Sequence, residues 1–128
     1  MRATTNRRAL IGALVLFAAC VPKARNGLAP APSPAVYVSV DNQNWLDVSI
    51  YALRGTIRTR IGEVSGNGNA QLKIPAGVIV AGQVRLMADA IGSSERFVTD
   101  MITVDPDQRV QLMVAPAMRM SSYAVHRR

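Results

Sequence analysis

Between residues 36 and 114 apolar side chains recur at every second position, the spacing of β-strands that bury one face. The clearest segments have inward positions at Val36, Val38 and Val40; Leu46, Val48, Ile50 and Ala52; Ile57, Thr59 and Ile61; Val84, Leu86 and Ala88; and Val110, Leu112 and Val114. Leu72 with Ile74 indicates a shorter strand, and residues 97–104 indicate another. A less regular strand with a Met-rich face is expected at 118–125.

Turn-forming residues separate these segments. Arg54-Gly55 predicts a tight turn and hence a hairpin with the strand that follows. The run Ser65–Asn69 contains Gly and Asn, which tolerate positive φ, and we expect a hairpin loop there. Asp105–Gln108 has the composition of a type I turn, with Pro at its second position.

Seven or eight short strands without a convincing helical segment predict an all-β fold, an antiparallel β-sandwich. This pattern resembles immunoglobulin-like and transthyretin-like architectures, although the Cys, Trp, Cys framework of antibody domains is missing. We place the sandwich at residues 35–125 and a frayed tail at 126–128.

The N-terminus has the three-part layout of a secretory signal peptide. A basic start is followed by an apolar run from Ala9 to Ala19 and then by Cys20. As a helix, this run would span roughly 16 Å, about half the hydrocarbon thickness of a bilayer. We therefore expect an export signal over residues 1–19 and not an ordinary transmembrane helix.

The sequence Leu16-Phe-Ala-Ala-Cys20 resembles the lipobox of bacterial lipoproteins, with Phe17 where that family usually carries an aliphatic residue. The resemblance implies cleavage after Ala19, acyl chains such as palmitate on Cys20, and firm anchoring to a membrane. Val21 stands where inner-membrane retention signals place Asp, which favours the outer membrane in a diderm cell. The alternatives are an ordinary signal peptide, or an uncleaved short anchor.

Residues 20–34 form an expected linker rich in Pro and Ala. The 14 residues from Val21 to Pro34, if extended as polyproline, reach about 40 Å. Such a segment allows a domain to stand away from the bilayer, or else marks a plain domain boundary.

The formal charge is +7, which at first favours a nucleic-acid partner. Loss of Arg2, Arg7 and Arg8 with the signal lowers it to +4, and the remaining arginines are scattered singly. We therefore expect no nucleic-acid partner. The single cysteine leaves no internal disulfide and no CxxC metal or redox site.

The sequence shows no catalytic constellation, so we expect a protein that is not an enzyme. Its one histidine, His126, is the third residue from the end and is a poor general base. The alternative is a carboxylate-based hydrolase, although no pair of acids stands out. We expect Asp105 and Asp107 to cap the turn and not to bind calcium. We expect no metal and no cofactor.

Two groups of outward-facing residues are candidate binding sites. Trp45 and Tyr51 share one parity, and Tyr37 is expected to join them from a neighbouring strand as an aromatic grip for sugars or peptides. Their alternative is burial beneath a loop. A second group of cations is expected to form a positive stripe on one sheet, or to be a solvated edge that resists aggregation: Arg54, Arg58, Arg60 and Lys73.

These features lead to one functional hypothesis and one rival. The first is an exported, non-enzymatic lipoprotein of the cell envelope, anchored through Cys20, whose β-sandwich binds another envelope component, either protein or glycan. The rival is a structural or assembly subunit of a larger envelope complex, with its aromatic face permanently buried.

Overall fold

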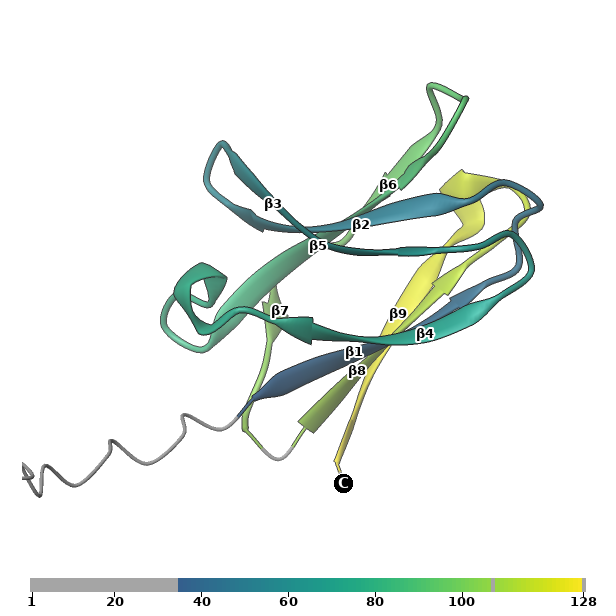
Figure 1. Ribbon diagram of the computed structural model, residues 1–128. Coiled ribbons are helices and arrows are strands. Elements are labelled where there is room, and N and C mark those ends of the chain that lie inside the picture. The colour runs from purple at the N-terminus through teal and green to yellow at the C-terminus, as the bar shows by residue number, and fades with distance from the viewer. Residues whose placement is uncertain (1–34, 107, 128) are drawn as a thin grey trace, which may run out of the picture.

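The computed structural model describes residues 35–106 and 108–127, which fold into two packed β-sheets (Figure 1). The predicted all-β sandwich is confirmed. These residues contain no α-helix, and their helical turns are 3-10 turns: η1 (Ala76–Val78) and η2 (Met118–Met120). The strands are β1 (Val36–Asn42), β2 (Val48–Arg54), β3 (Ile57–Val64), β4 (Asn69–Ile74), β5 (Gln83–Ala90), β6 (Arg96–Val98), β7 (Ile102–Thr103), β8 (Gln108–Val114) and β9 (Ser122–Arg127).

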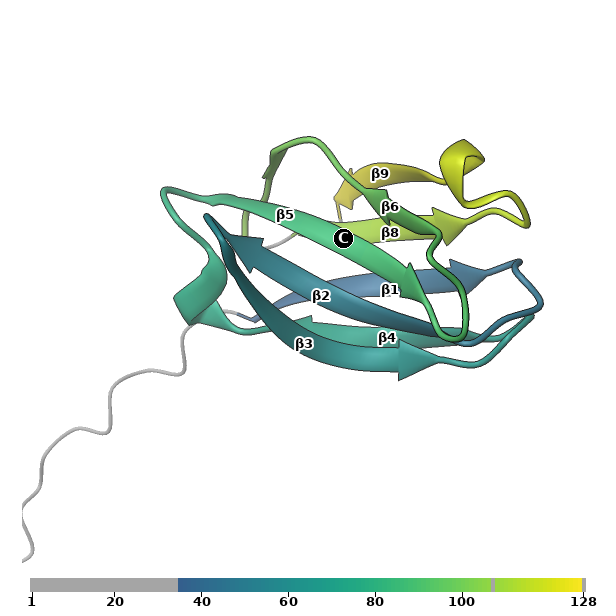
Figure 2. The ribbon, with the colours of Figure 1, turned by 90° about the horizontal axis from the view of Figure 1, so that it is seen from above.

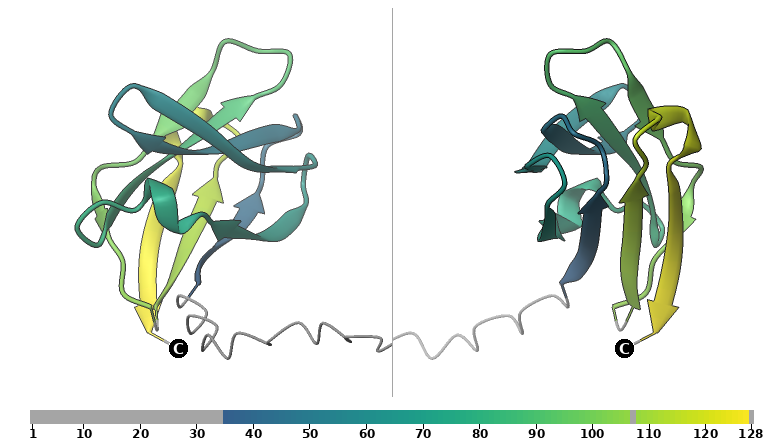
Figure 3. Two further views of the ribbon diagram at one scale, coloured as in Figure 1. Left: turned by 60° about the vertical axis from the view of Figure 1, so that its left-hand side comes forward. Right: turned by 90° about the vertical axis from the view of Figure 1, so that its right-hand side faces the viewer.

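The nine strands divide into a four-stranded and a five-stranded sheet. Sheet A has the order β4-β1-β8-β9, and sheet B has the order β3-β2-β5-β6 with β7 also paired to β5. Figure 2 looks down on sheet B with sheet A behind it, and Figure 3 shows the two sheets from toward the ends of the sandwich. Each sheet has one inward and one outward face, as the alternation predicted.

The core lies between the two inward faces. Val38 pairs with Val110 in sheet A, and Ile50 pairs with Ala88 in sheet B; all four are fully buried. Burial of each large aliphatic side chain contributes about 1.5–3 kcal/mol. The core cluster of the described residues extends from Val36 to Met118 and contacts both sheets. The hydrophobic core of residues 35–106 and 108–127 therefore lies between the two sheets.

One strand pairing differs from the expected antiparallel pattern. β1 and β8 run parallel, with Tyr37 opposite Arg109 and Val40 opposite Leu112. The other pairings between strands are antiparallel. The parallel pair arises because the chain crosses to sheet B after β1 and reaches β8 only after several strands.

The β2–β3 hairpin is confirmed at Arg54-Gly55. Its two-residue loop has Gly55 at φ 57°, a left-handed conformation that favours glycine. A register shift between Ile50 and Tyr51 bends the hairpin. Ile57, expected to point inward, is 64% exposed because it lies at the hairpin tip beyond the core.

The strand expected to bury Leu46, Val48, Ile50 and Ala52 begins only at Val48. Asn42 Oδ1 accepts a hydrogen bond from the Asn44 backbone N–H, and Asn44 Oδ1 accepts one from that of Leu46. These side-chain turns hold the segment in a loop. Both asparagines are buried, and the Asn42 amide also donates to the carbonyl oxygens of Leu46 and Ser65.

The single strand expected at 97–104 is two strands, β6 and β7. Between them, Thr99 Oγ1 accepts a hydrogen bond from the Leu86 backbone N–H, while the Thr99 N–H donates to the Leu86 carbonyl. A side-chain oxygen thus replaces a backbone carbonyl in the ladder. The interruption explains why the described part of the chain has nine strands and not seven or eight.

The Ser65–Asn69 loop and the C-terminal tail also differ from expectation. The loop does not close a hairpin, because β3 belongs to sheet B and β4 to sheet A. The tail does not fray at residue 126, since β9 continues to Arg127 and His126 pairs with Arg109.

The sandwich has two distinct ends. At the proximal end the described chain begins at Ala35, β1 and β8 start, and β4 and β9 finish (Figure 1). The β2–β3 hairpin tip lies at this end too, because the Arg54 guanidinium donates to the Gly77 carbonyl of η1. The distal end carries the β1–β2 and β3–β4 loops, the β5–β6 turn and η2 (Figure 2).

Candidate functional site

The outward face of sheet A carries mostly hydrogen-bonding side chains, and we call it the polar face. The strand registers align these residues in rows across β4, β1, β8 and β9. The proximal row is Lys73, Tyr37, Arg109 and His126. The middle row is Gln71, Ser39, Gln111 and Ala124. The distal row is Asn69, Asp41, Met113 and Ser122.

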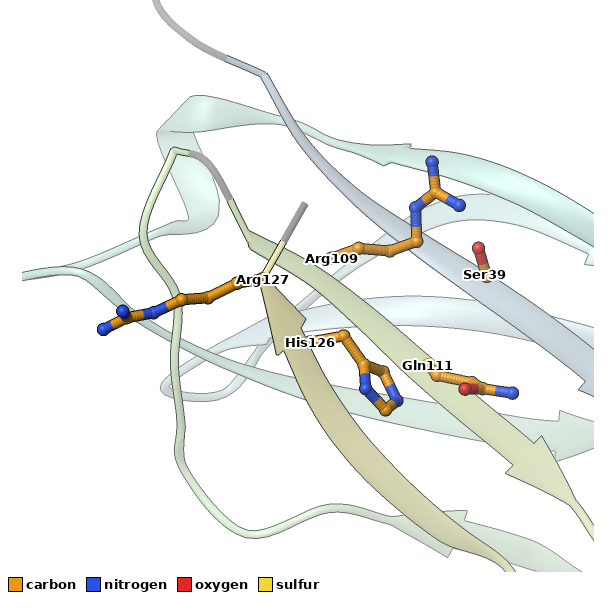
Figure 4. A pocket seen from close by; sticks show the side chains of 5 residues that line it. All are labelled: Ser39, Arg109, Gln111, His126 and Arg127. Carbon is orange, nitrogen blue, oxygen red and sulfur yellow. The ribbon is translucent and has the colours of Figure 1, made fainter.

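Three adjoining hollows run over the polar face. The first, of about 460 Å³, is lined by Ser39, Arg109, Gln111, His126 and Arg127. In Figure 4 the first four lie beside one another over β1, β8 and β9, while the Arg127 guanidinium points away from them. The second hollow, of about 430 Å³, extends toward Asp41, Asn69 and Gln71, and the third, of about 270 Å³, toward Tyr123. All three share Gln111.

The chemistry of these hollows is that of hydrogen bonding. Gln71, Gln111 and Asn69 each offer two amide donors and a carbonyl acceptor, and Ser39 offers a hydroxyl. At the proximal row the cations Lys73 and Arg109 lie on either side of Tyr37 in the neighbouring strands. The face can therefore bind a hydroxyl-rich ligand along its length and a negative group at its proximal row.

The predicted aromatic cluster does not form. Tyr37 is on β1 of sheet A, whereas Tyr51 is on β2 of sheet B with its side chain on the opposite outer face. Trp45 is not on a strand and is 73% exposed in the β1–β2 loop at the distal end. The expectation failed because β1 and β2, although consecutive, lie in different sheets.

The predicted cationic stripe is divided in the same way. Arg58 and Arg60 remain together on β3 of sheet B, but Lys73 lies on β4 of sheet A beside Tyr37. Arg60 forms an ion pair with Glu63. Arg54 donates to the Gly77 carbonyl and so contributes to the proximal end of the sandwich.

The outward face of sheet B differs in chemistry from the polar face. Tyr51 lies opposite Met87, which is buried, and Met87 lies opposite Val98. The Arg58 guanidinium carbon is 6.0 Å from the Tyr51 ring centre, at the limit of a cation–π contact. Because arginines surround this apolar centre, we call it the arginine-rimmed face; they are Arg58, Arg60, Arg85 and Arg96.

The described residues contain no group of three or more His, Cys, Asp or Glu side chains able to hold a metal ion. Asp41 is the single acid among the residues that line the three hollows. His126 is exposed and occupies the proximal row of the polar face. Cys20 and Asp107 lie outside the described residues.

Sequence reasoning missed the residues at the centre of the polar face. Ser39, Gln71 and Gln111 each have outward parity, and that signal was present in the sequence. Their convergence depends on the order β4-β1-β8-β9, in which only the last two strands are consecutive in the chain. No local pattern reveals such an order. Within residues 35–106 and 108–127 no helix is long and apolar enough to span a bilayer.

Comparison with known proteins gives little information on function. No protein-family model and no curated protein matches the chain. Among solved structures, the NMR structure of a protein from Eubacterium rectale is similar, with 16% sequence identity and a TM-score of 0.46. The similarity covers 77% of this chain and 93% of that one.

Proposed function

We propose that this chain is a non-enzymatic lipoprotein of the cell envelope that binds an envelope glycan across its polar face. The observation that carries the proposal is the row of adjoining hollows centred on Gln111. Planar amides and hydroxyls at strand spacing match the repeated hydroxyl groups of an extended sugar chain. Lys73 and Arg109 match an acidic substituent on that chain.

The composition of the polar face favours a glycan over a protein partner. Protein interfaces are enriched in aromatic residues, Met and Arg around an apolar centre. The middle row instead contains two glutamines, a serine and an alanine. Such a surface keeps its groups hydrated when empty and exchanges water for ligand hydroxyls on binding.

The binding proposal is tested with the purified chain from Val21 onward and soluble acidic peptidoglycan fragments, by calorimetry. We expect saturable binding that Gln71→Ala/Gln111→Ala weakens at least about tenfold, because two hydrogen-bonding amides contribute about 1 kcal/mol each. The matched control is Gln83→Ala, an exposed amide on sheet B. Equal affinities for the double variant and the control would overturn the proposal, as would the absence of binding.

The location rests on the N-terminal sequence. The basic start, the apolar run of 11 residues and Leu16-Phe-Ala-Ala-Cys20 support export, cleavage and acylation of Cys20. Val21 supports the outer membrane over the inner one. Mass spectrometry of the mature N-terminus should find an acylated Cys20 in the membrane fraction. After a high-salt wash, which screens electrostatic attachment to lipid, Cys20→Ser should be found in the soluble fraction. An unmodified Cys20, or a variant that stays on the membrane after that wash, contradicts the anchor.

The second candidate function, a structural subunit of an envelope complex, is favoured by the arginine-rimmed face. Tyr51, Met87 and Val98 give it the apolar centre of a protein interface. The two candidates differ in oligomeric state. Sedimentation of the purified lipid-free chain as a monomer favours the binding module, and a stable oligomer that Tyr51→Glu disrupts favours the subunit.

A further inference from the structure

Charged side chains separate along the strand axis. The proximal end carries cations from both sheets: Arg54, Arg58, Lys73, Arg85, Arg109 and Arg127. The distal end carries most of the described acids: Asp41, Asp47, Glu63, Asp89 and Glu95. Strand registers fix this polarity, because residues that are far apart in sequence align at the same level of the sandwich.

The exceptions do not cancel the polarity. At the distal end Arg96 lies opposite Asp89, and Arg119 lies in η2. Arg60, near the middle of β3, is paired with Glu63. Two acids lie toward the proximal end: Asp105 precedes β8, and Asp100 lies level with Arg85, because Thr99 pairs with Leu86. Among the described residues the proximal end is therefore strongly positive.

Apolar side chains accompany these cations at the proximal end. A hollow of about 430 Å³ is lined by Leu53, Val78, Val80 and Met101, together with the guanidinium-bearing Arg54 and Arg85. Val80 is 48% exposed and Met101 is 56% exposed. Ile57 at the hairpin tip adds a third exposed apolar side chain.

Backbone hydrogen bonds hold Val80 at the proximal end. Val80 and Gln83 exchange two backbone hydrogen bonds around a two-residue turn, Ala81-Gly82. Both turn residues have positive φ, at 50° and 73°, as in a type I′ turn. The turn therefore holds Val80 beside the hollow with little freedom to move.

The chain enters the sandwich at this same end. Ala35 directly precedes β1, and Tyr37 lies level with Lys73 and Arg109. The 14 residues from Val21 to Pro34 have a contour of at most about 50 Å. A membrane anchor at Cys20 would thus lie within reach of the proximal end.

We propose that the proximal end docks on a lipid surface that carries anionic headgroups. Arg54, Arg85 and the neighbouring cations contact headgroup phosphates, and Val80, Met101 and Ile57 enter the boundary with the acyl chains. Cations beside exposed apolar side chains match the surface of a membrane, where anionic headgroups lie next to apolar acyl chains. An acidic glycan would satisfy the arginines but not the apolar hollow. The orientation relative to the anchoring membrane rests on the proposed lipidation of Cys20, whereas the affinity for lipid does not.

The test measures co-sedimentation of the lipid-free chain from Val21 onward with vesicles of phosphatidylcholine, with and without phosphatidylglycerol. We expect binding only to the anionic vesicles and a loss of binding as salt is added. Arg54→Glu/Arg85→Glu should weaken it at least about tenfold, since each cation near the surface contributes about 1 kcal/mol. The control, Arg96→Glu/Arg119→Glu, changes the net charge equally at the distal end and should retain most of the binding.

A second pair of variants tests the apolar side chains of the proximal end. It leaves Arg54 and Arg85 unchanged, because both arginines also form hydrogen bonds within the protein. Val80→Ser/Met101→Ser should lower binding several-fold, and Ile91→Ser/Met120→Ser, exposed residues at the distal end, should not. Trp45, the one tryptophan of the chain, reports orientation from the distal end. Bromine-labelled lipid should leave its fluorescence unquenched on the vesicles, while aqueous iodide quenches it.

The outcomes separate this proposal from the proposed function. Equal losses for the two charge pairs, equal losses for the two apolar pairs, or quenching of Trp45 by bromine-labelled lipid would each overturn membrane docking through the proximal end. Gln71→Ala/Gln111→Ala should not change vesicle binding. Glycan binding that fails while vesicle binding succeeds, or the reverse, assigns the failure to one proposal alone.

Discussion

At the scale of single residues, small polar side chains and a glycine determine how the distal loops pack. Asn42 joins the β1–β2 and β3–β4 loops through its buried amide, and Asp47 Oδ1 accepts a hydrogen bond from the Gly66 backbone N–H. These residues have no apolar periodicity. The sequence identifies them only as residues typical of loops. It does not predict the hydrogen bonds by which they hold the two loops against each other.

Gly66 lies where no side chain fits. A Cβ at this position would be 2.2 Å from the Trp45 carbonyl oxygen, and backbone cannot rotate away as a side chain does. We therefore expect Gly66→Ala to lower the free energy of unfolding by about 2 kcal/mol or more, measured by urea denaturation.

The matched control for Gly66 is Gly77→Ala. A Cβ at Gly77 meets no atom within 4 Å, and its φ is not positive. Gly77→Ala should therefore leave the free energy of unfolding unchanged or raise it slightly. A Gly66→Ala protein as stable as Gly77→Ala would show that the two loops are not held in contact.

At the scale of elements, the alternation of apolar and polar residues predicted the strands. It did not predict where each strand begins and ends, or which strands pair. The inward positions of β1, β5 and β8 are buried as predicted. β2 begins later than expected because the Asn side chains accept backbone hydrogen bonds that would otherwise join strands. The 97–104 segment is divided at Thr99 because the Thr99 hydroxyl accepts the hydrogen bond that a backbone carbonyl accepts in a regular strand pair. Both changes come from side-chain hydrogen bonds, which period-two patterns do not report.

Thr99→Val tests the division between β6 and β7. Valine keeps the shape but removes the oxygen that accepts from the buried Leu86 backbone N–H. An unpaired buried donor costs about 1–3 kcal/mol, and we expect a loss of that size in thermal or urea unfolding. Thr103→Val, at an exposed position of β7, should stay within about 0.5 kcal/mol of the original protein. Equal effects of the two substitutions would contradict this role of Thr99.

At the scale of the whole molecule, sheet topology gives each outer surface its own chemistry. Tyr37 and Tyr51 seemed to be neighbours in sequence reasoning, yet they lie on opposite outer faces. The polar face gathers Ser39, Gln71 and Gln111 from three strands, and the proximal end gathers cations from both sheets. The candidate site was thus predictable in residue type and parity but not in position, because sheet order is set by contacts between distant segments.

The parallel pairing of β1 with β8 bears on the timing of folding. β1 lies between β4 and β8, and its partner Arg109 follows Tyr37 by 72 residues. Contacts of such sequence separation form slowly, because a long loop must close before they are made. A nascent chain cannot pair β1 with β8 until β8 has been synthesised, and it cannot complete sheet A until β9 has followed. For a chain that is exported, as we propose, this late closure leaves time for translocation before the sandwich forms.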